Sequence, residues 1–228
     1  MPLYAACLRK ACESDPPPFG LRWYGEKYRA LASDASWLAM SLVQNAQVEG
    51  DGSKKLWNLA GRTRDTVIAD HVRRHAVDES RHALLYIAMT RAAFPRALDS
   101  ALEQMLSNVS PKYGSHDVPV VLEASSEDWV LDELIQMNIG EIRTRINQLL
   151  LRPMVQVHAA EEARPIVQRL LDALLLDETR HIAYTAKLIE AAAAGGRRRY
   201  VENVMAQRVR DFNEITIHEV GTETFAGE

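Results

Sequence analysis

The pattern Asp-Glu-x-Arg-His occurs twice in the chain, at residues 78–82 and again at 177–181. Each copy lies in a long stretch whose apolar residues recur at helical spacing, so we expect each copy on a helix. Within a helix the Glu and the His, three residues apart, share one face. The repeat therefore favours a fold in which two helices face each other and direct both pairs toward one point.

The remainder of the chain also has helical periodicity and almost no strand signals, which predicts an all-α fold. We expect one domain over residues 1–228, with a bundle core at about 26–194 and a last amphipathic helix at about 198–219. The other predicted helices cover about 26 to 60–65, 66–94, 96–108, 126–152 and 164–194, with Gly195 and Gly196 ending the last of these.

Two of these helices have a predicted inward stripe that mixes apolar and ionisable residues. On the first long helix the stripe comprises Leu31, Leu38, Leu42, Glu49 and Leu56. On the second it comprises Val72, His75, Glu79, His82, Tyr86 and Met89.

A single glutamate precedes each Glu-x-x-His pair at a separation that an antiparallel hairpin would bring level. Glu49 precedes Glu79 by 30 residues (79 − 49), and Glu141 precedes Glu178 by 37 residues (178 − 141). The midpoints fall near residues 64 and 160, where polar residues already predict turns.

Glu26 competes with Glu49 for the first of these positions. Pairing Glu26 with Glu79 would require the chain to reverse near residue 52, where Gly50 and Gly52 are poor helix formers. We prefer Glu49, because its hairpin geometry is satisfied and small residues beside a metal leave room for a substrate.

Four carboxylates and two imidazoles form an oxygen-rich ligand set that suits divalent iron, with manganese as an alternative. Burying four ionised carboxylates without cations would be prohibitively unfavourable, so two metal ions would be part of the fold. The predicted ligands are Glu49, Glu79, His82, Glu141, Glu178 and His181.

Further residues of the repeated motif are predicted to support these ligands. Asp78 and Asp177 would accept the N–H of a ligating His on the opposing helix, and Arg81 and Arg180 would pair with those Asp residues or with a ligand carboxylate. His75, one turn before Glu79, is either an additional ligand, a supporting donor or a satisfied core histidine.

Composition excludes several classes of partner. The formal net charge is −4 at pH 7, which supplies no basic field for nucleic acid. No stretch reaches the roughly 20 apolar residues that span a bilayer, and the N-terminus lacks the form of a secretory signal. The two cysteines, Cys7 and Cys12, are expected as reduced thiols. We therefore expect a cytoplasmic protein, and a homodimer on the base rate of oligomers.

Glu49, the motif at 78–82, Glu141 and the motif at 177–181 resemble the di-iron oxygenase branch of the ferritin-like superfamily. The motif is similar to that of bacterial multicomponent monooxygenase hydroxylases and of arylamine N-oxygenases. The resemblance implies a ferritin-like four-helix bundle, here with additional short helices, that binds two irons through the six predicted ligands.

The resemblance further implies a catalytic di-metal centre that activates O2 and hydroxylates or N-oxygenates a small organic substrate, in a biosynthetic pathway. No flavin, haem or iron–sulfur motif occurs in the sequence, so electrons would come from an external reductase or ferredoxin. The alternative is a ferritin-like ferroxidase, iron store or peroxide scavenger.

Overall fold

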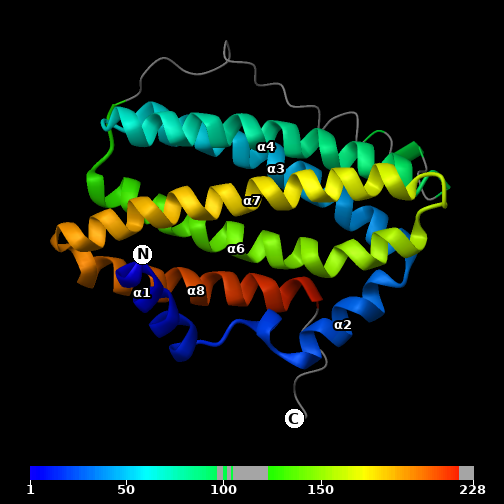
Figure 1. The fold of residues 1–228 in the computed structure, drawn as a ribbon, viewed down its shortest axis with the longest axis horizontal. Helices are drawn as coiled ribbons and strands as arrows, with labels where there is room; N and C mark the ends of the chain where they lie inside the picture. Colours follow the sequence, from blue (N-terminus) through cyan, green and yellow to red (C-terminus); the bar gives the residue numbers. More distant parts are fainter. Residues whose placement is uncertain (97–99, 102–103, 105–122, 221–228) are drawn as a thin grey trace. The chain divides into compact units, whose positions relative to one another are not determined.

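All regular secondary structure that the computed structural model describes is helical (Figure 1). The described residues are 1–96, 100–101, 104 and 123–220. Among them no strand occurs, so the prediction of an all-α chain is confirmed for this part of the sequence. The elements are α1 (Pro2–Ser14), η1 (Pro18–Gly20), α2 (Arg22–Ala32), α3 (Ala35–Arg62), α4 (Thr66–Ala93), α6 (Glu127–His158), α7 (Arg164–Ala192), η2 (Ala193–Arg197) and α8 (Arg198–Val220).

The chain divides into two compact units, each assembled from separate segments. Helices α6 and α7 are continuous across the division and contribute residues to both units. The single domain over 1–228 stays a prediction. Unit 1 comprises Met1–Leu31, Leu131–Leu150 and Glu178–Glu228, and unit 2 comprises Ala32–Val130 and Leu151–Asp177.

Unit 2 contains a hairpin of two 28-residue helices, α3 and α4, which lie side by side (Figure 1). The turn between them falls inside the predicted segment 60–65. Asp65 is the N-cap of α4 and ends this turn. Its side chain accepts hydrogen bonds from the backbone N–H groups of Val67 and Ile68. The buried apolar side chains of the hairpin include Leu38, Leu42, Leu56, Val72, Tyr86 and Met89.

The prediction of one uninterrupted helix from about residue 26 to 60–65 is wrong. Helix α2 ends at Ala32 and α3 begins at Ala35. The side chain of Asp34 accepts hydrogen bonds from the backbone N–H groups of Ser36 and Trp37, at 2.7 and 3.0 Å. This N-cap stabilises a new helix start, which the apolar periodicity of the segment does not reveal.

The third long helix was predicted to end at Arg152, whereas α6 continues through Pro153 to His158. A proline inside a helix removes one backbone hydrogen bond but does not prevent continuation where tertiary contacts hold the following turn. The His158 ring supplies such contacts, because it lies 5.5 Å from the ring of Phe94 and its Nε2 lies 3.0 Å from the carbonyl oxygen of Ala32.

Three further comparisons concern the predicted helices. Helix α1 was not predicted. The predicted end of the fourth long helix at Gly195 and Gly196 is confirmed. Gly196 has φ of 95°, a backbone conformation that favours glycine and is not helical, and α8 starts at Arg198. The predicted short helix at about 96–108 lies outside the described residues, apart from isolated positions.

The core of unit 1 forms where α1, α8 and the unit 1 parts of α6 and α7 contribute apolar side chains. Helices α1 and α8 lie against each other (Figure 1). The buried core residues are Tyr4, Cys7, Ala11, Leu131, Ile135, Ile139, Ala186, Ile189, Ala193, Val201, Met205 and Val209.

Asn138 connects three helices at the edge of this core through buried hydrogen bonds. The Tyr4 hydroxyl on α1 donates to Asn138 Oδ1 at 2.8 Å, and Asn138 Nδ2 donates to Thr185 Oγ1 on α7 at 2.8 Å. Thr185 in turn donates to the carbonyl oxygen of His181 at 2.7 Å. The network holds α1, α6 and α7 in register close to residues of the repeated motif.

We expect Asn138→Leu to lower the free energy of unfolding by about 2 kcal/mol, because it leaves buried hydroxyls without this partner. Urea denaturation measures the change. Adding Tyr4→Phe to Asn138→Leu should then have a smaller effect than Tyr4→Phe alone, since the hydroxyl has already lost its acceptor. Strictly additive losses would contradict the coupling.

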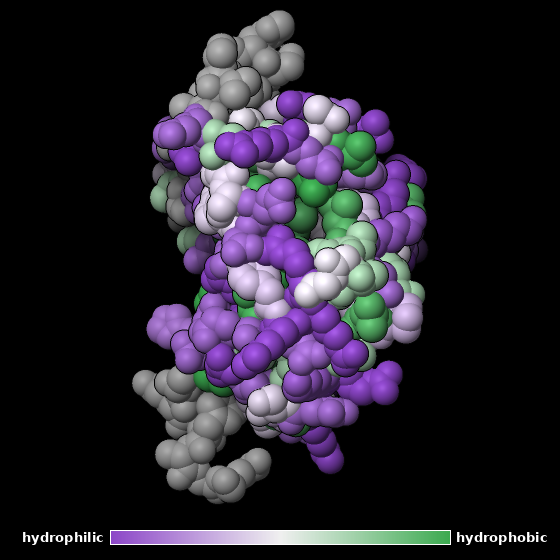
Figure 2. All heavy atoms as spheres, turned by 90° about the vertical axis from the view of Figure 1, so that its left-hand side faces the viewer, coloured by the Kyte–Doolittle hydropathy of each residue, from purple (hydrophilic) through white to green (hydrophobic). Residues whose placement is uncertain are grey.

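Figure 2 shows one face on which hydrophilic side chains predominate and hydrophobic ones form smaller groups. Among the described residues, no helix combines the length and the apolar character that crossing a bilayer requires.

Candidate metal site

Unit 2 brings one carboxylate of α3 together with the Glu-x-x-His pair of α4. Glu49, Glu79 and His82 form this unit 2 triad, and they each offer a ligand atom within 4.8 Å of the others. His82 Nδ1 lies 3.6 Å from Glu49 Oε2 and 3.4 Å from Glu79 Oε1. Two atoms that each lie about 2.1 Å from one metal ion are at most about 4.2 Å apart. The distances from His82 to both carboxylates therefore fit a shared ion.

The unit 2 triad is buried, with exposed fractions of 6, 7 and 0% for Glu49, Glu79 and His82. Burial raises the pKa of Glu49 well above its usual value, and the charge of Glu79 raises it further. Burial lowers the pKa of His82, but the carboxylates of Glu49 and Glu79 outweigh this effect and raise it overall. The cluster thus favours added positive charge, which a proton or a divalent cation can supply.

The second ring nitrogen of His82 faces α7. His82 Nε2 lies 3.2 Å from Asp177 Oδ2, and Arg81 donates to the same carboxylate oxygen. Asp177 Oδ2 can accept the Nε2–H of His82, which leaves Nδ1, the atom facing Glu49 and Glu79, to carry a proton or to bind a cation. With a metal ion bound, Asp177 would hold His82 in the tautomer that presents Nδ1 to the ion.

The other predicted supporting residues lie farther from the imidazole. Asp78 is half-buried and accepts a hydrogen bond from Arg81 at 2.7 Å, so Arg81 bridges Asp78 and Asp177. Arg180 is exposed. The pairing of Arg81 with both Asp residues matches the expectation for that side chain, while the roles of these residues toward a metal remain predictions.

We expect Asp177→Asn to weaken divalent metal binding about 10- to 100-fold, because the neutral amide orients His82 less strongly and pairs poorly with Arg81. Isothermal titration with Mn2+ measures the affinity. Asp172→Asn is the matched control, since Asp172 lies on the same helix but pairs with Arg152 at the surface. Equal affinity of the Asp177 and Asp172 variants would contradict the orienting role.

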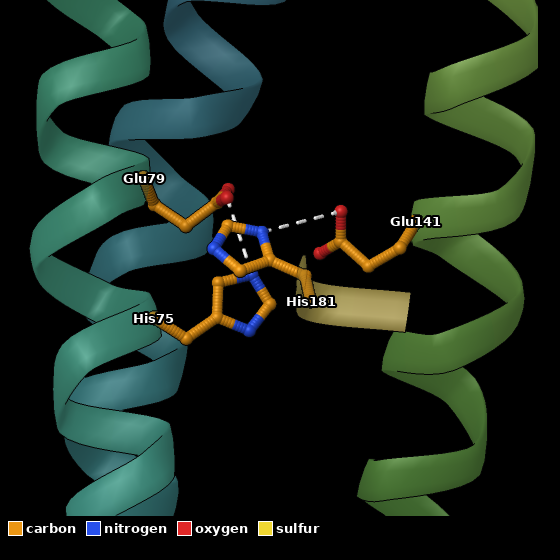
Figure 3. A group of neighbouring side chains, drawn as sticks. All are labelled: His75, Glu79, Glu141 and His181. Atoms are coloured by element: carbon orange, nitrogen blue, oxygen red, sulfur yellow. Dashed lines mark ion pairs between the residues drawn. The ribbon is translucent and has the colours of Figure 1, made fainter. Parts of the chain in front are cut away.

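Unit 1 repeats the composition of this cluster. Glu141 of α6 with Glu178 and His181 of α7 form the unit 1 triad, and all three are buried. His181 Nδ1 lies 3.8 Å from Glu141 Oε2 and 3.6 Å from Glu178 Oε2. Figure 3 shows the dashed ion pair between His181 and Glu141. At these distances His181 could share an ion with either carboxylate.

His75 lies one helical turn before Glu79, and both side chains extend from α4 (Figure 3). Its Nε2 is 3.3 Å from Glu79 Oε1, and the side chain is 1% exposed. The structure thus places His75 in contact with a predicted ligand, where it can hold Glu79 or contribute a further nitrogen donor.

Glu26, the competing candidate for the first carboxylate, is exposed and pairs with Arg22 at 2.7 Å on α2. Helix α3 runs without reversal through Gly50 and Gly52, so the chain does not turn near residue 52 as the pairing of Glu26 with Glu79 would require.

Gln148 was not singled out from the sequence, whereas Gly52 was expected only as a small residue that leaves room beside a metal. Gln148 is 1% exposed and donates from Nε2 to Glu178 Oε1 at 2.9 Å. Its position seven residues after Glu141, on the same face of α6, was the signal available for it. A Cβ added to Gly52 would lie 3.1 Å from Glu79 Oε2, so this glycine leaves space for that carboxylate.

Each triad offers two carboxylates and one imidazole, and neither includes a thiol. Both cysteines, Cys7 and Cys12, are free. Such oxygen-rich donors with one nitrogen suit Fe2+ or Mn2+ better than a metal that prefers sulfur. The unit 2 triad is a buried cluster that could hold a metal ion. No protein-family model matches the chain, and comparison with curated proteins and with solved structures gives no match either.

Proposed function

We propose that the unit 1 and unit 2 triads together bind two iron ions and that the chain is a non-haem di-iron oxygenase with a ferritin-like four-helix bundle. In this proposal α3, α4, α6 and α7 are the bundle helices, and the other helices are additions. The observation that carries it is the pair of buried clusters with one composition, each formed by one Glu and one Glu-x-x-His.

The second copy of the repeated motif contributes to both clusters. Asp177 contacts His82 of the unit 2 triad, and the next residue of α7, Glu178, belongs to the unit 1 triad. In this proposal each triad would hold one of the two ions.

The chain's own groups have defined tasks in this proposal. Glu49, Glu79, Glu141 and Glu178 would balance the charge of the ions, and His82 would be held as a neutral Nδ1 donor by Asp177. Burial of the triads would exclude bulk water, and Gly52 would leave the Glu79 carboxylate room to move. Two adjacent irons would supply electrons to O2 for oxidation of a small organic molecule, and an external reductase or ferredoxin would restore them.

Rapid mixing of the anaerobic, reduced, iron-loaded protein with O2 tests the oxygenase. We expect a transient visible absorption that decays faster when an oxidisable substrate is present. The Glu178→Ala variant is the control, because it lacks a predicted ligand. A wild-type protein that binds two irons but gives no transient would contradict oxygen activation.

The same sample separates the oxygenase from an iron store. Light scattering gives the mass of the assembly, and a store requires a closed cage of many copies. A mass far above that of a dimer, with iron retained well beyond two ions per chain, would favour storage over the enzyme.

A further inference from the structure

Gln148 is a buried amide that engages one oxygen of a predicted ligand. Its Nε2 donates to Glu178 Oε1 at 2.9 Å, and its exposed fraction is 1%. A hydrogen bond to a carboxylate is stronger than one between neutral groups, and burial strengthens it further. The Oε1 atom of Glu178 is therefore held against α6.

The other oxygen of Glu178 faces the imidazole. Glu178 Oε2 lies 3.6 Å from His181 Nδ1, which is the distance expected for two atoms on one metal ion. Gln148 and His181 thus lie next to different oxygens of the Glu178 carboxylate. Rotation of the Glu178 carboxylate to present both oxygens to the ion would break the bond to Gln148.

We propose that Gln148 is a positioning residue that restricts Glu178 to a single metal-binding oxygen, Oε2, and so makes the two metal positions of the protein unequal. This inference rests on the proposed di-metal function. Gln148 does not touch the ion itself, and it acts through Glu178.

In unit 2 the position on α3 that corresponds to Gln148 carries no amide. The residue seven positions after Glu49 on α3 is Leu56, which is buried and has no amide, whereas the residue seven positions after Glu141 is Gln148. Glu79 Oε1 instead lies 3.3 Å from His75 Nε2. The two carboxylates therefore have different neighbours, an amide donor for Glu178 and an imidazole for Glu79.

Titration of the metal-free protein with Co2+ tests the inference, because the visible spectrum of Co2+ reports its coordination number. Wild-type protein should bind two Co2+ ions with different spectra. Gln148→Met keeps the length of the side chain and removes the N–H donor. In this variant one Co2+ should bind about 10- to 100-fold more weakly, because Glu178 is no longer oriented by the amide. The spectrum of that ion should also change, because Glu178 can then use both oxygens.

Two comparison variants locate and calibrate the effect. His181→Ala should remove the Co2+ ion that Gln148→Met perturbs, which assigns that ion to the unit 1 triad. Gln156→Met is the matched control, since Gln156 lies two turns farther along α6 and donates to Gln168 at 3.1 Å. It should leave both affinities and both spectra unchanged.

The outcomes separate this inference from the proposed function. Two bound ions with unchanged affinity and spectrum in Gln148→Met would overturn the role of Gln148 and leave the di-metal site standing, even if the variant melted at a lower temperature. Wild-type protein that binds no Co2+ would overturn both. If Gln148→Met does not fold, the wild-type titration still tests the inference. Two Co2+ ions with identical spectra would overturn the claim that the two metal positions are unequal.

Discussion

Replacing Glu178 by Ala is expected to lower the iron content of the purified protein from about two ions per chain to below one. Glu178 is fully buried, its Oε2 lies 3.6 Å from His181 Nδ1, and Gln148 holds its Oε1. Removal of the carboxylate leaves the imidazole with one carboxylate instead of two. Elemental analysis of protein loaded under anaerobic conditions measures the stoichiometry.

Glu26→Ala is the control for this loss, because Glu26 was the competing candidate in the sequence and is exposed on α2 beside Arg22. It should retain about two irons. Circular dichroism of both variants establishes that the helices remain. A Glu178→Ala protein that still binds about two irons would show that the ligand set is wrong.

Removal of metal is expected to destabilise the protein strongly. Glu49, Glu79 and His82 are buried within 4.8 Å of one another, and the raised pKa of Glu49 shows that burial disfavours its charge. A cation bound only by the folded state stabilises it by about 4 kcal/mol at a free concentration of about 1,000 times Kd. For a chain of this length that corresponds to an increase in Tm of about 8–16 °C.

Differential scanning calorimetry of anaerobic samples with Fe2+ or with a chelator measures this shift. The Glu178→Ala variant should show a smaller shift, and Mg2+ in place of Fe2+ should have little effect, because Mg2+ prefers oxygen ligands and keeps its waters. An unchanged Tm after metal removal would indicate a metal-free structural bundle instead.

Part of the fold was accessible from the sequence because it depends on contacts within one helix or across one short turn. The 60–65 turn and the end at Gly195 and Gly196 follow from local backbone preferences. The buried stripe of α4, from Val72 through His82 to Met89, follows from the helical repeat. These features are properties of neighbouring residues along the chain.

Two helix boundaries were missed because the local sequence signals for continuing and for ending a helix disagreed. The apolar stripe continues past Asp34, and only the capping hydrogen bonds of its side chain reveal that a new helix begins there. Pro153 is a helix breaker by propensity, yet α6 continues because His158 contacts Phe94 and the carbonyl of Ala32. Tertiary contacts outweigh propensity in this segment.

The sequence alone determined that Glu79 and His82 share one helix face, and likewise Glu178 and His181. Residues three apart in a helix lie on the same face. Only the tertiary structure decided which side chains of other helices meet them. The sequence favoured Glu49 over Glu26 and expected Asp177 to meet a His of the opposing helix. The contacts themselves, and the bond from Gln148 to Glu178 that was not expected, depend on the rotation and register of packed helices. Those quantities are set by the fit of whole helix surfaces, which no local pattern records.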